Sequence, residues 1–132
     1  MKVYKLIDNS TITRKDMLLI LDWCKYFLGR SKFFSIKKLK LRVKTRSKLL
    51  GQFIIDDNLI EINPLIHNDI IHLIETVIHE YVHFQQNPLE FDYLDRKYDF
   101  DDYFDHPHEY EAESTAIKLS KICYKNIKNK LS

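Results

Sequence analysis

Residues 70–86 hold the feature that most restricts how this chain can fold. They read Ile-Ile-His-Leu-Ile-Glu-Thr-Val-Ile-His-Glu-Tyr-Val-His-Phe-Gln-Gln. At about 100° per residue, the polar side chains form one stripe and apolar side chains fill most other directions. Such a helix is buried in a core and shows one face to a cleft. We expect it to begin at a cap on Asn68 or Asp69 and to end near Gln86, before Pro88.

The polar stripe of this helix contains the motif His-Glu-x-x-His. His79 and His83 are four residues apart, so they share one helix face and can reach the same metal ion. Glu80 points toward the same edge, where it can take a proton from a water molecule on that metal. The alternative is a stripe that faces solvent, with histidines that are merely exposed.

A catalytic zinc ion needs a third protein ligand and one open position. A third histidine six residues after His83 is absent, because that position holds Leu89. A second helix, expected to open near Pro107, carries three glutamates. Glu109 and Glu113 share its side of small apolar residues, whereas Glu111 points with the lysines toward water. Inward carboxylates need a metal or hydrogen bonds. We therefore expect Glu109 to bind the metal and Glu113 to accept a hydrogen bond from a ligand histidine.

Together, His79-Glu80-x-x-His83 and Glu109-Tyr110-Glu111-Ala112-Glu113 resemble the motifs of the gluzincin zinc peptidases, in their compact single-domain form. In that family the first glutamate of the second motif binds zinc, and an acid four residues later supports a ligand histidine. Here that acid is Glu113, where aspartate is usual. The resemblance spans roughly residues 50–125 and implies a zincin-like fold with a sheet, an active-site helix and a glutamate helix.

The predicted function is a zinc-dependent metallopeptidase that hydrolyses peptide or protein substrates, with Glu80 as the general base. The donor that stabilises the oxyanion is left open among Tyr103, Tyr110 and His108. By analogy with the family, a peptide substrate lies along strand 52–55. The first rival is a zinc-binding regulatory or structural domain without peptidase activity.

The rest of the chain predicts an α+β fold within a single domain, residues 1–132. Residues 12–30 have helical periodicity, with Thr13 as N-cap and Gly29 at the end. Alternation predicts a strand over 36–43 and a hairpin of 52–55 with 59–62, which together give an antiparallel sheet of about three strands. Residues 87–107 lack a regular pattern and are interpreted as a substrate-binding or lid segment.

Charge is divided unevenly along the chain. Residues 1–50 carry 14 Lys and Arg against 3 Asp, and residues 51–132 carry 7 basic against 16 acidic residues. The first half is therefore +11 (14 − 3) and the second −9 (7 − 16). The second rival follows: a nucleic-acid-associated protein that uses the basic half. A solvated basic face is the plainer alternative.

The two cysteines, Cys24 and Cys123, fall in separate helical stretches. With no signal peptide and no apolar run long enough to span a membrane, we expect free thiols in a reducing, cytoplasmic compartment and no membrane partner. A disulfide between the terminal helices is the alternative. The Lys-, Ile- and Asn-rich, Gly-poor composition suggests an AT-rich genome, bacterial or viral.

Overall fold

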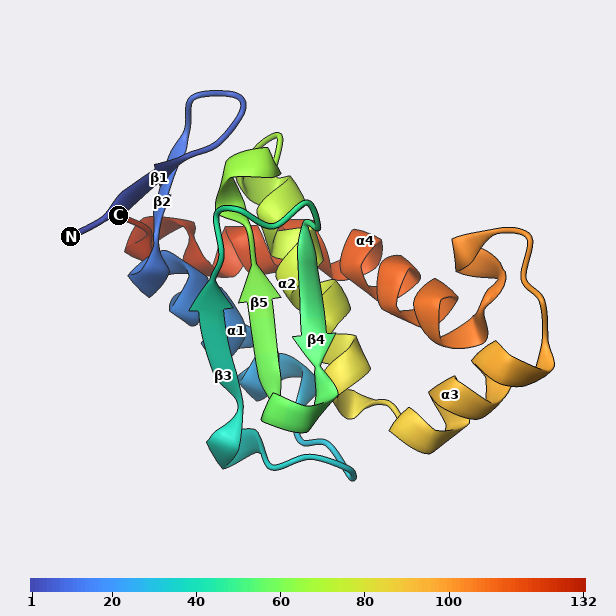
Figure 1. Ribbon diagram of the computed structural model, residues 1–132. Coiled ribbons are helices and arrows are strands. Elements are labelled where there is room, and N and C mark those ends of the chain that lie inside the picture. The colour runs from blue at the N-terminus through green and yellow to red at the C-terminus, as the bar shows by residue number, and fades with distance from the viewer.

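The computed structural model describes residues 1–132 as four α-helices and two small sheets (Figure 1). The strands are β1 (Val3–Lys5), β2 (Thr11–Thr13), β3 (Lys40–Val43), β4 (Gly51–Ile54) and β5 (Leu59–Ile62). The helices are α1 (Arg14–Leu28), α2 (Ile70–Gln85), α3 (Pro88–Lys97) and α4 (Pro107–Ile127). The α+β prediction is confirmed, and no helix is both long and apolar enough to cross a membrane.

Helix α1 begins and ends where its local chemistry predicts. The Asp16 backbone N–H donates to Thr13 Oγ1 at 3.2 Å, and the Thr13 N–H donates to Asp16 Oδ2 at 2.9 Å. This reciprocal pair is a capping box, which satisfies two backbone N–H groups that the first turn leaves free. Gly29, with φ of 81°, terminates the helix.

The larger sheet has the strand order β3-β5-β4. The β4–β5 hairpin is confirmed as antiparallel, with Phe53 opposite Ile60. The prediction of an all-antiparallel sheet was wrong, because β3 pairs with β5 in parallel. All four residues of β5 are buried, and this strand lies at the centre of the sheet. The chain reverses direction between β3 and β4 and again between β4 and β5, so β5 runs parallel to β3. The strand expected over 36–43 also starts late, after a 3-10 turn over Ile36–Lys38.

A second, two-stranded sheet went unpredicted. β1 and β2 pair in antiparallel around a tight turn in which Asn9 has φ of 71°. Three-residue strands are too short to show a clear alternation, so periodicity could not reveal them. Leu6 and Ile12 from this hairpin join the hydrophobic core.

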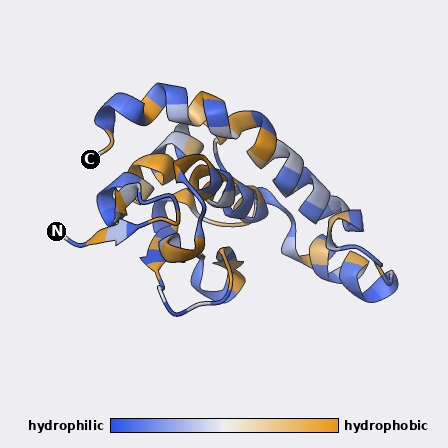
Figure 2. Ribbon diagram, turned by 90° about the horizontal axis from the view of Figure 1, so that it is seen from above, coloured by the Kyte–Doolittle hydropathy of each residue, from blue (hydrophilic) through white to orange (hydrophobic).

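Helix α2 is the centre of the molecule, as predicted. Asp69 caps it, accepting from the His72 N–H at 2.8 Å, and ten of its residues are buried. Seen from above in Figure 2, α2 lies in the middle of the body, with α4 along one side. α4 packs on α2 through a face of small and apolar residues, including Ala112, Ala116 and Cys123. Cys24 and Cys123 are buried free thiols, so no disulfide joins the helices.

The segment 87–107 was expected to lack regular structure, and this expectation was wrong, because α3 and a 3-10 turn over Tyr103–Asp105 form most of it. Pro88 does not simply stop a helix; it opens α3 at the first position, where its missing N–H costs nothing. The Asn87 side chain caps this helix by accepting from the Leu89 and Glu90 N–H groups. α3 has no buried residue, and it projects from the body in both ribbon views (Figures 1 and 2).

Candidate metal centre

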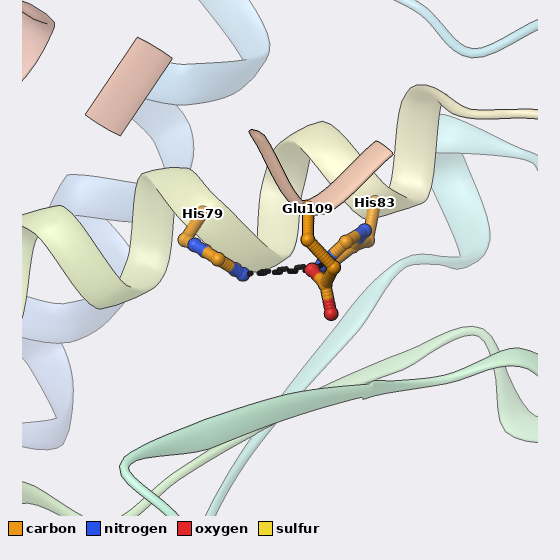
Figure 3. Close-up of side chains that lie close together, drawn as sticks. All are labelled: His79, His83 and Glu109. Carbon is orange, nitrogen blue, oxygen red and sulfur yellow. Dashed lines mark hydrogen bonds and ion pairs between the residues drawn. The ribbon is translucent and has the colours of Figure 1, made fainter. Parts of the chain in front are cut away.

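Two histidines of α2 and one glutamate of α4 converge where these helices pack (Figure 3). His79 Nε2 lies 3.2 Å from His83 Nε2 and 3.3 Å from Glu109 Oε1. His83 Nε2 lies 2.5 Å from the same carboxylate oxygen. The side chains of His79, His83 and Glu109 are only 10%, 13% and 7% exposed. This trio, predicted from the sequence, could hold a metal ion.

The hydrogen bond between His83 Nδ1 and Gln86 shows which ring nitrogen of His83 carries the proton. Gln86 Nε2 donates to the His108 carbonyl at 2.8 Å and to Glu111 Oε1 at 2.9 Å. The amide oxygen of Gln86 must therefore be the atom that faces His83 Nδ1, at 2.7 Å. An amide oxygen only accepts, so Nδ1 carries the proton and donates. Nε2 of His83 is left with a lone pair directed at the centre.

His79 is oriented in the same way by Glu113. Its Nδ1 lies 3.0 Å from Glu113 Oε2, and an ionised carboxylate only accepts. The proton therefore sits on Nδ1, and Nε2 presents a lone pair. Two ring nitrogens and a carboxylate oxygen thus face one another without a proton of their own. Three converging acceptors repel unless a cation lies among them.

The donor set and spacing fit a metal ion in most respects. Bonds of about 2.1 Å in a tetrahedral arrangement place neighbouring donors about 3.4 Å apart. Two of the three separations, 3.2 and 3.3 Å, agree with this spacing. The third, 2.5 Å between His83 Nε2 and Glu109 Oε1, is shorter than this spacing. A small rotation of the Glu109 carboxylate would open that distance.

The electrostatics of the trio keep Glu109 ionised. Burial raises the pKa of this carboxyl, but the adjacent His79 and His83 rings and the Tyr103 hydroxyl outweigh burial and hold the pKa far below its usual range. For His79, burial lowers the pKa, yet Glu109 and the surrounding carboxylates produce a net rise. The rise at His79 shows that the nearby carboxylates favour a positive charge at this point.

Glu80 lies beside the trio without joining it. Its side chain is buried, and burial raises its pKa above the usual range despite the nearby histidines. A carboxyl whose pKa is raised holds a proton more readily, which suits a group that must accept one and later give it back.

Two cavities open on either side of Glu80, along the edge strand β4. One has a volume of 290 Å³ and is lined by His83, Glu109 and several aromatic rings. The other, of 450 Å³, reaches His79, Glu75 and Glu113. Both cavities share Leu49, Gly51, Glu80 and Tyr103, so they form one cleft.

Gly51 allows β4 to lie this close to α2. A Cβ atom at this position would stand 2.7 Å from Thr76 Cγ2 and 2.9 Å from Ile62 Cδ1, well inside contact distance. Any larger residue would push the strand away from the helix. The predicted edge strand therefore lines the cleft because residue 51 has no side chain.

The structure separates the three candidate oxyanion donors. Tyr103 lines both cavities, and burial and the neighbouring Glu109 raise the pKa of its hydroxyl strongly. Tyr110 is 64% exposed and lines neither cavity. His108 is buried and directs Nε2 to Glu90 Oε1, 2.8 Å away. Only Tyr103 is brought to the centre.

Gln86 and Glu111 are the partners that sequence reasoning missed. Glu111 is exposed, as expected, but its carboxylate also accepts from Gln86. The available signal was the position of Gln86, three residues after His83 and therefore on the same helix face. An amide at that spacing does not by itself identify its partners.

Comparisons with known protein families, with curated proteins and with solved structures find no match. What the fold and site define is an α+β protein with a His-His-Glu cluster able to hold a metal ion.

Proposed function

We propose that the protein is a zinc-dependent metallopeptidase. The observation that carries the proposal is the trio of His79, His83 and Glu109, with Glu80 beside it in a cleft along an edge strand. Two imidazoles and one carboxylate are the ligand set of catalytic zinc, with a fourth position open. Zinc bound there would supply a Lewis acid for the substrate carbonyl and lower the pKa of a water molecule to about 7.

Glu80 is the general base of the proposed reaction. It accepts a proton from the attacking water and delivers it to the leaving amine, so the carboxylate is restored after each turnover. Glu80 lines both cavities, which supports a position for it near the middle of a bound substrate rather than at one end.

Glu113 and Gln86 are positioning residues. By accepting from Nδ1 of His79 and of His83, they fix both rings with Nε2 toward the metal. Tyr103 supplies the donor for the developing oxyanion. Its raised pKa keeps the hydroxyl protonated at neutral pH, so that it can donate a hydrogen bond.

A peptide substrate is supported by the free edge of β4. This strand pairs with β5 on one side only, so its other edge offers unpaired backbone groups to an extended chain. Addition of a strand to such an edge is a general mode of peptide recognition.

The decisive test replaces Glu80 with Gln and measures zinc content and cleavage of a peptide mixture. Glu80→Gln should retain zinc and lose turnover by at least about a hundredfold, the usual contribution of a general base. Asp22→Asn, an exposed carboxylate on α1 away from the cleft, is the control and should cleave normally. Retained turnover in Glu80→Gln would refute this mechanism. Zinc binding without hydrolysis by the unaltered protein would instead support a non-catalytic zinc domain.

A second candidate function, nucleic-acid binding, is favoured by unpaired cations. Residues 25–48 contain ten Lys and Arg and no acidic residue. Of these ten, only Arg42 forms an ion pair, with Glu61. Replacing the exposed, unpaired Lys37, Lys38 and Lys40 with Ala should then weaken DNA binding and flatten its salt dependence. Replacing Lys118, Lys121 and Lys125 on α4 is the control, and equal losses in both variants would argue against a defined surface.

A further inference from the structure

We propose that the 290 Å³ cavity binds a large apolar side chain of the substrate, on the amino side of the cleaved bond. The proposal rests on the peptidase function above and names the substrate preference of the same site. The cavity opens directly onto Glu80, His83 and Glu109, so a side chain that fills it belongs to a residue next to the reacting carbonyl.

Aromatic rings form the walls of this cavity. Phe34 and Phe53 meet edge to face with centroids 5.1 Å apart, and both lean on the buried ring of Phe84 at 6.2 and 6.0 Å. On the opposite side, Phe91 packs against His83 at 5.7 Å and stacks on His106 at 4.2 Å. Each wall is anchored by buried groups, so the cavity exists before the substrate arrives.

The lining of the cavity selects for apolar surface. Besides the aromatic rings, Leu49, Ile55 and Pro88 contribute; Gln52, Gln86 and Asn87 add neutral polar groups, and no lysine or arginine lines the cavity. Its charged members, Glu80 and Glu109, belong to the catalytic centre. A volume of 290 Å³ lies at the lower end of ligand pockets, which suits one large side chain.

The two sides of the cleft differ in chemistry. The 450 Å³ cavity beyond Glu80 is lined by the charged side chains of Lys48, Glu75 and Glu113 as well as by apolar Leu49, Leu50 and Phe104. An apolar side chain placed there would cover charged groups without replacing their hydration. The apolar preference should therefore be stronger on the side of the 290 Å³ cavity, which holds no charged group outside the catalytic centre.

The direction of β4 determines which side that is. The apolar cavity extends to Ile55, just past the carboxyl end of β4, whereas the polar cavity extends to Lys48, ahead of its amino end. Antiparallel pairing is the more stable arrangement for an added strand. A substrate in that orientation passes Ile55 first and Lys48 last. Its residues before the cleaved bond therefore face the apolar cavity.

The test is a cleavage profile of a random peptide library, read by mass spectrometry with the zinc-loaded protein. Large apolar residues should be enriched directly before the cut. In matched peptides, Leu or Phe at that position should raise kcat/KM about tenfold to a hundredfold over Ala, as expected for a buried side chain. The residue after the cut should show a weaker preference, because charged side chains line the second cavity beside Leu50 and Phe104.

Ile55→Glu sharpens the test, because Ile55 is 49% exposed and its replacement should not disturb folding. This variant should lose most of the apolar preference and favour Lys or Arg at the same position. Ile117→Glu, an exposed isoleucine on α4, is the matched control and should keep the original profile.

The outcomes separate the two proposals. Cleavage without apolar enrichment, enrichment only after the cut, or an unchanged profile in Ile55→Glu would each refute the subsite while leaving the peptidase intact. Absence of cleavage by the unaltered protein, with zinc bound, would refute the peptidase and the subsite together.

Discussion

The convergence of three acceptors predicts that zinc stabilises the fold. It also predicts that substitution of Glu109 removes this stabilisation and that substitution of Glu111 leaves most of it in place. His79 and His83 are already oriented by Gln86 and Glu113, so zinc meets a preformed site in the native state and none in the unfolded chain. At a free zinc concentration of a hundred times Kd, linkage gives about 2.7 kcal/mol. For 132 residues the entropy of unfolding is about 0.28 kcal/mol/K, so the melting temperature should rise by about 10 °C.

Glu109→Gln removes the charged ligand. If affinity falls even a hundredfold, the same zinc concentration equals Kd, where the stabilisation is only about 0.4 kcal/mol, or about 1.5 °C. Glu111→Gln is the matched control, because it makes the same chemical change two residues further along the same helix. It weakens only the support of Gln86, so it should retain most of the 10 °C shift.

Thermal unfolding can be followed by the fluorescence of Trp23, the single tryptophan and a core residue. Metal-free protein and both variants are melted with and without zinc, beside a metal analysis of each. A full shift in Glu109→Gln, or a shift lost in Glu111→Gln alone, would refute the assignment of the third ligand. An unaltered protein that zinc does not stabilise would refute the site itself.

Three further predictions concern the fold. Burial holds the pKa of His67 at about 4, so acidification from pH 7 to 4.5 should cost roughly 2 kcal/mol of stability, measured by urea denaturation. The sign follows from the lowered pKa: the contribution of His67 to stability is fully present above pH 6.5 and falls toward pH 4, because the unfolded chain binds a proton on this ring before the folded protein does. His67→Asn should reduce the loss of stability on acidification, and His72→Asn should not. Burial raises the pKa of the Cys24 thiol well above its usual range, and it raises the pKa of the Cys123 thiol to about 12. Neither thiol should therefore react with a thiol reagent at pH 8 until the protein unfolds. Arg42→Ala should cost about 1–3 kcal/mol, because it strips the paired charge from the buried Glu61 carboxylate, and a urea midpoint unchanged from the parent would contradict this.

The parts of the fold that the sequence predicts are those set by local chemistry. The capping box at Thr13 and Asp16, the cap at Asp69 and the hairpin turn before Leu59 each depend on neighbours within a few residues. Sheet order is different. Whether β3 pairs with β4 or β5 depends on which strand is buried most deeply, and that comparison involves segments far apart in the chain.

Pro88 shows why the sequence did not predict a helix in residues 87–107. A proline after a helix is equally compatible with the end of one helix and the first turn of the next. The sequence held the deciding signal in Asn87, whose side chain caps α3. That signal was outweighed by the acidic and aromatic residues that follow, which have no clear helical stripe.

The cluster of His79, His83 and Glu109 was predictable because helix geometry separates Glu109 from Glu111. At 100° per residue, two positions apart on a helix point to nearly opposite sides, whichever helix packs against them. Gln86 was not predictable in the same way. Its role arises from two acceptors on α4, the His108 carbonyl and Glu111, which meet it only after α2 and α4 dock.

The proposed centre therefore has two halves of different rigidity. The metal ligands lie on α2 and α4, whose contact is buried along its length and includes Ala112 and Ala116. Tyr103 and Phe91, by contrast, belong to the projecting segment 88–105, which buries no residue in α3. Local stability follows buried apolar contact, so this segment can open at a lower cost in free energy than the helix pair. Substitutions that loosen residues 88–105 should thus impair turnover and the apolar preference while metal affinity persists.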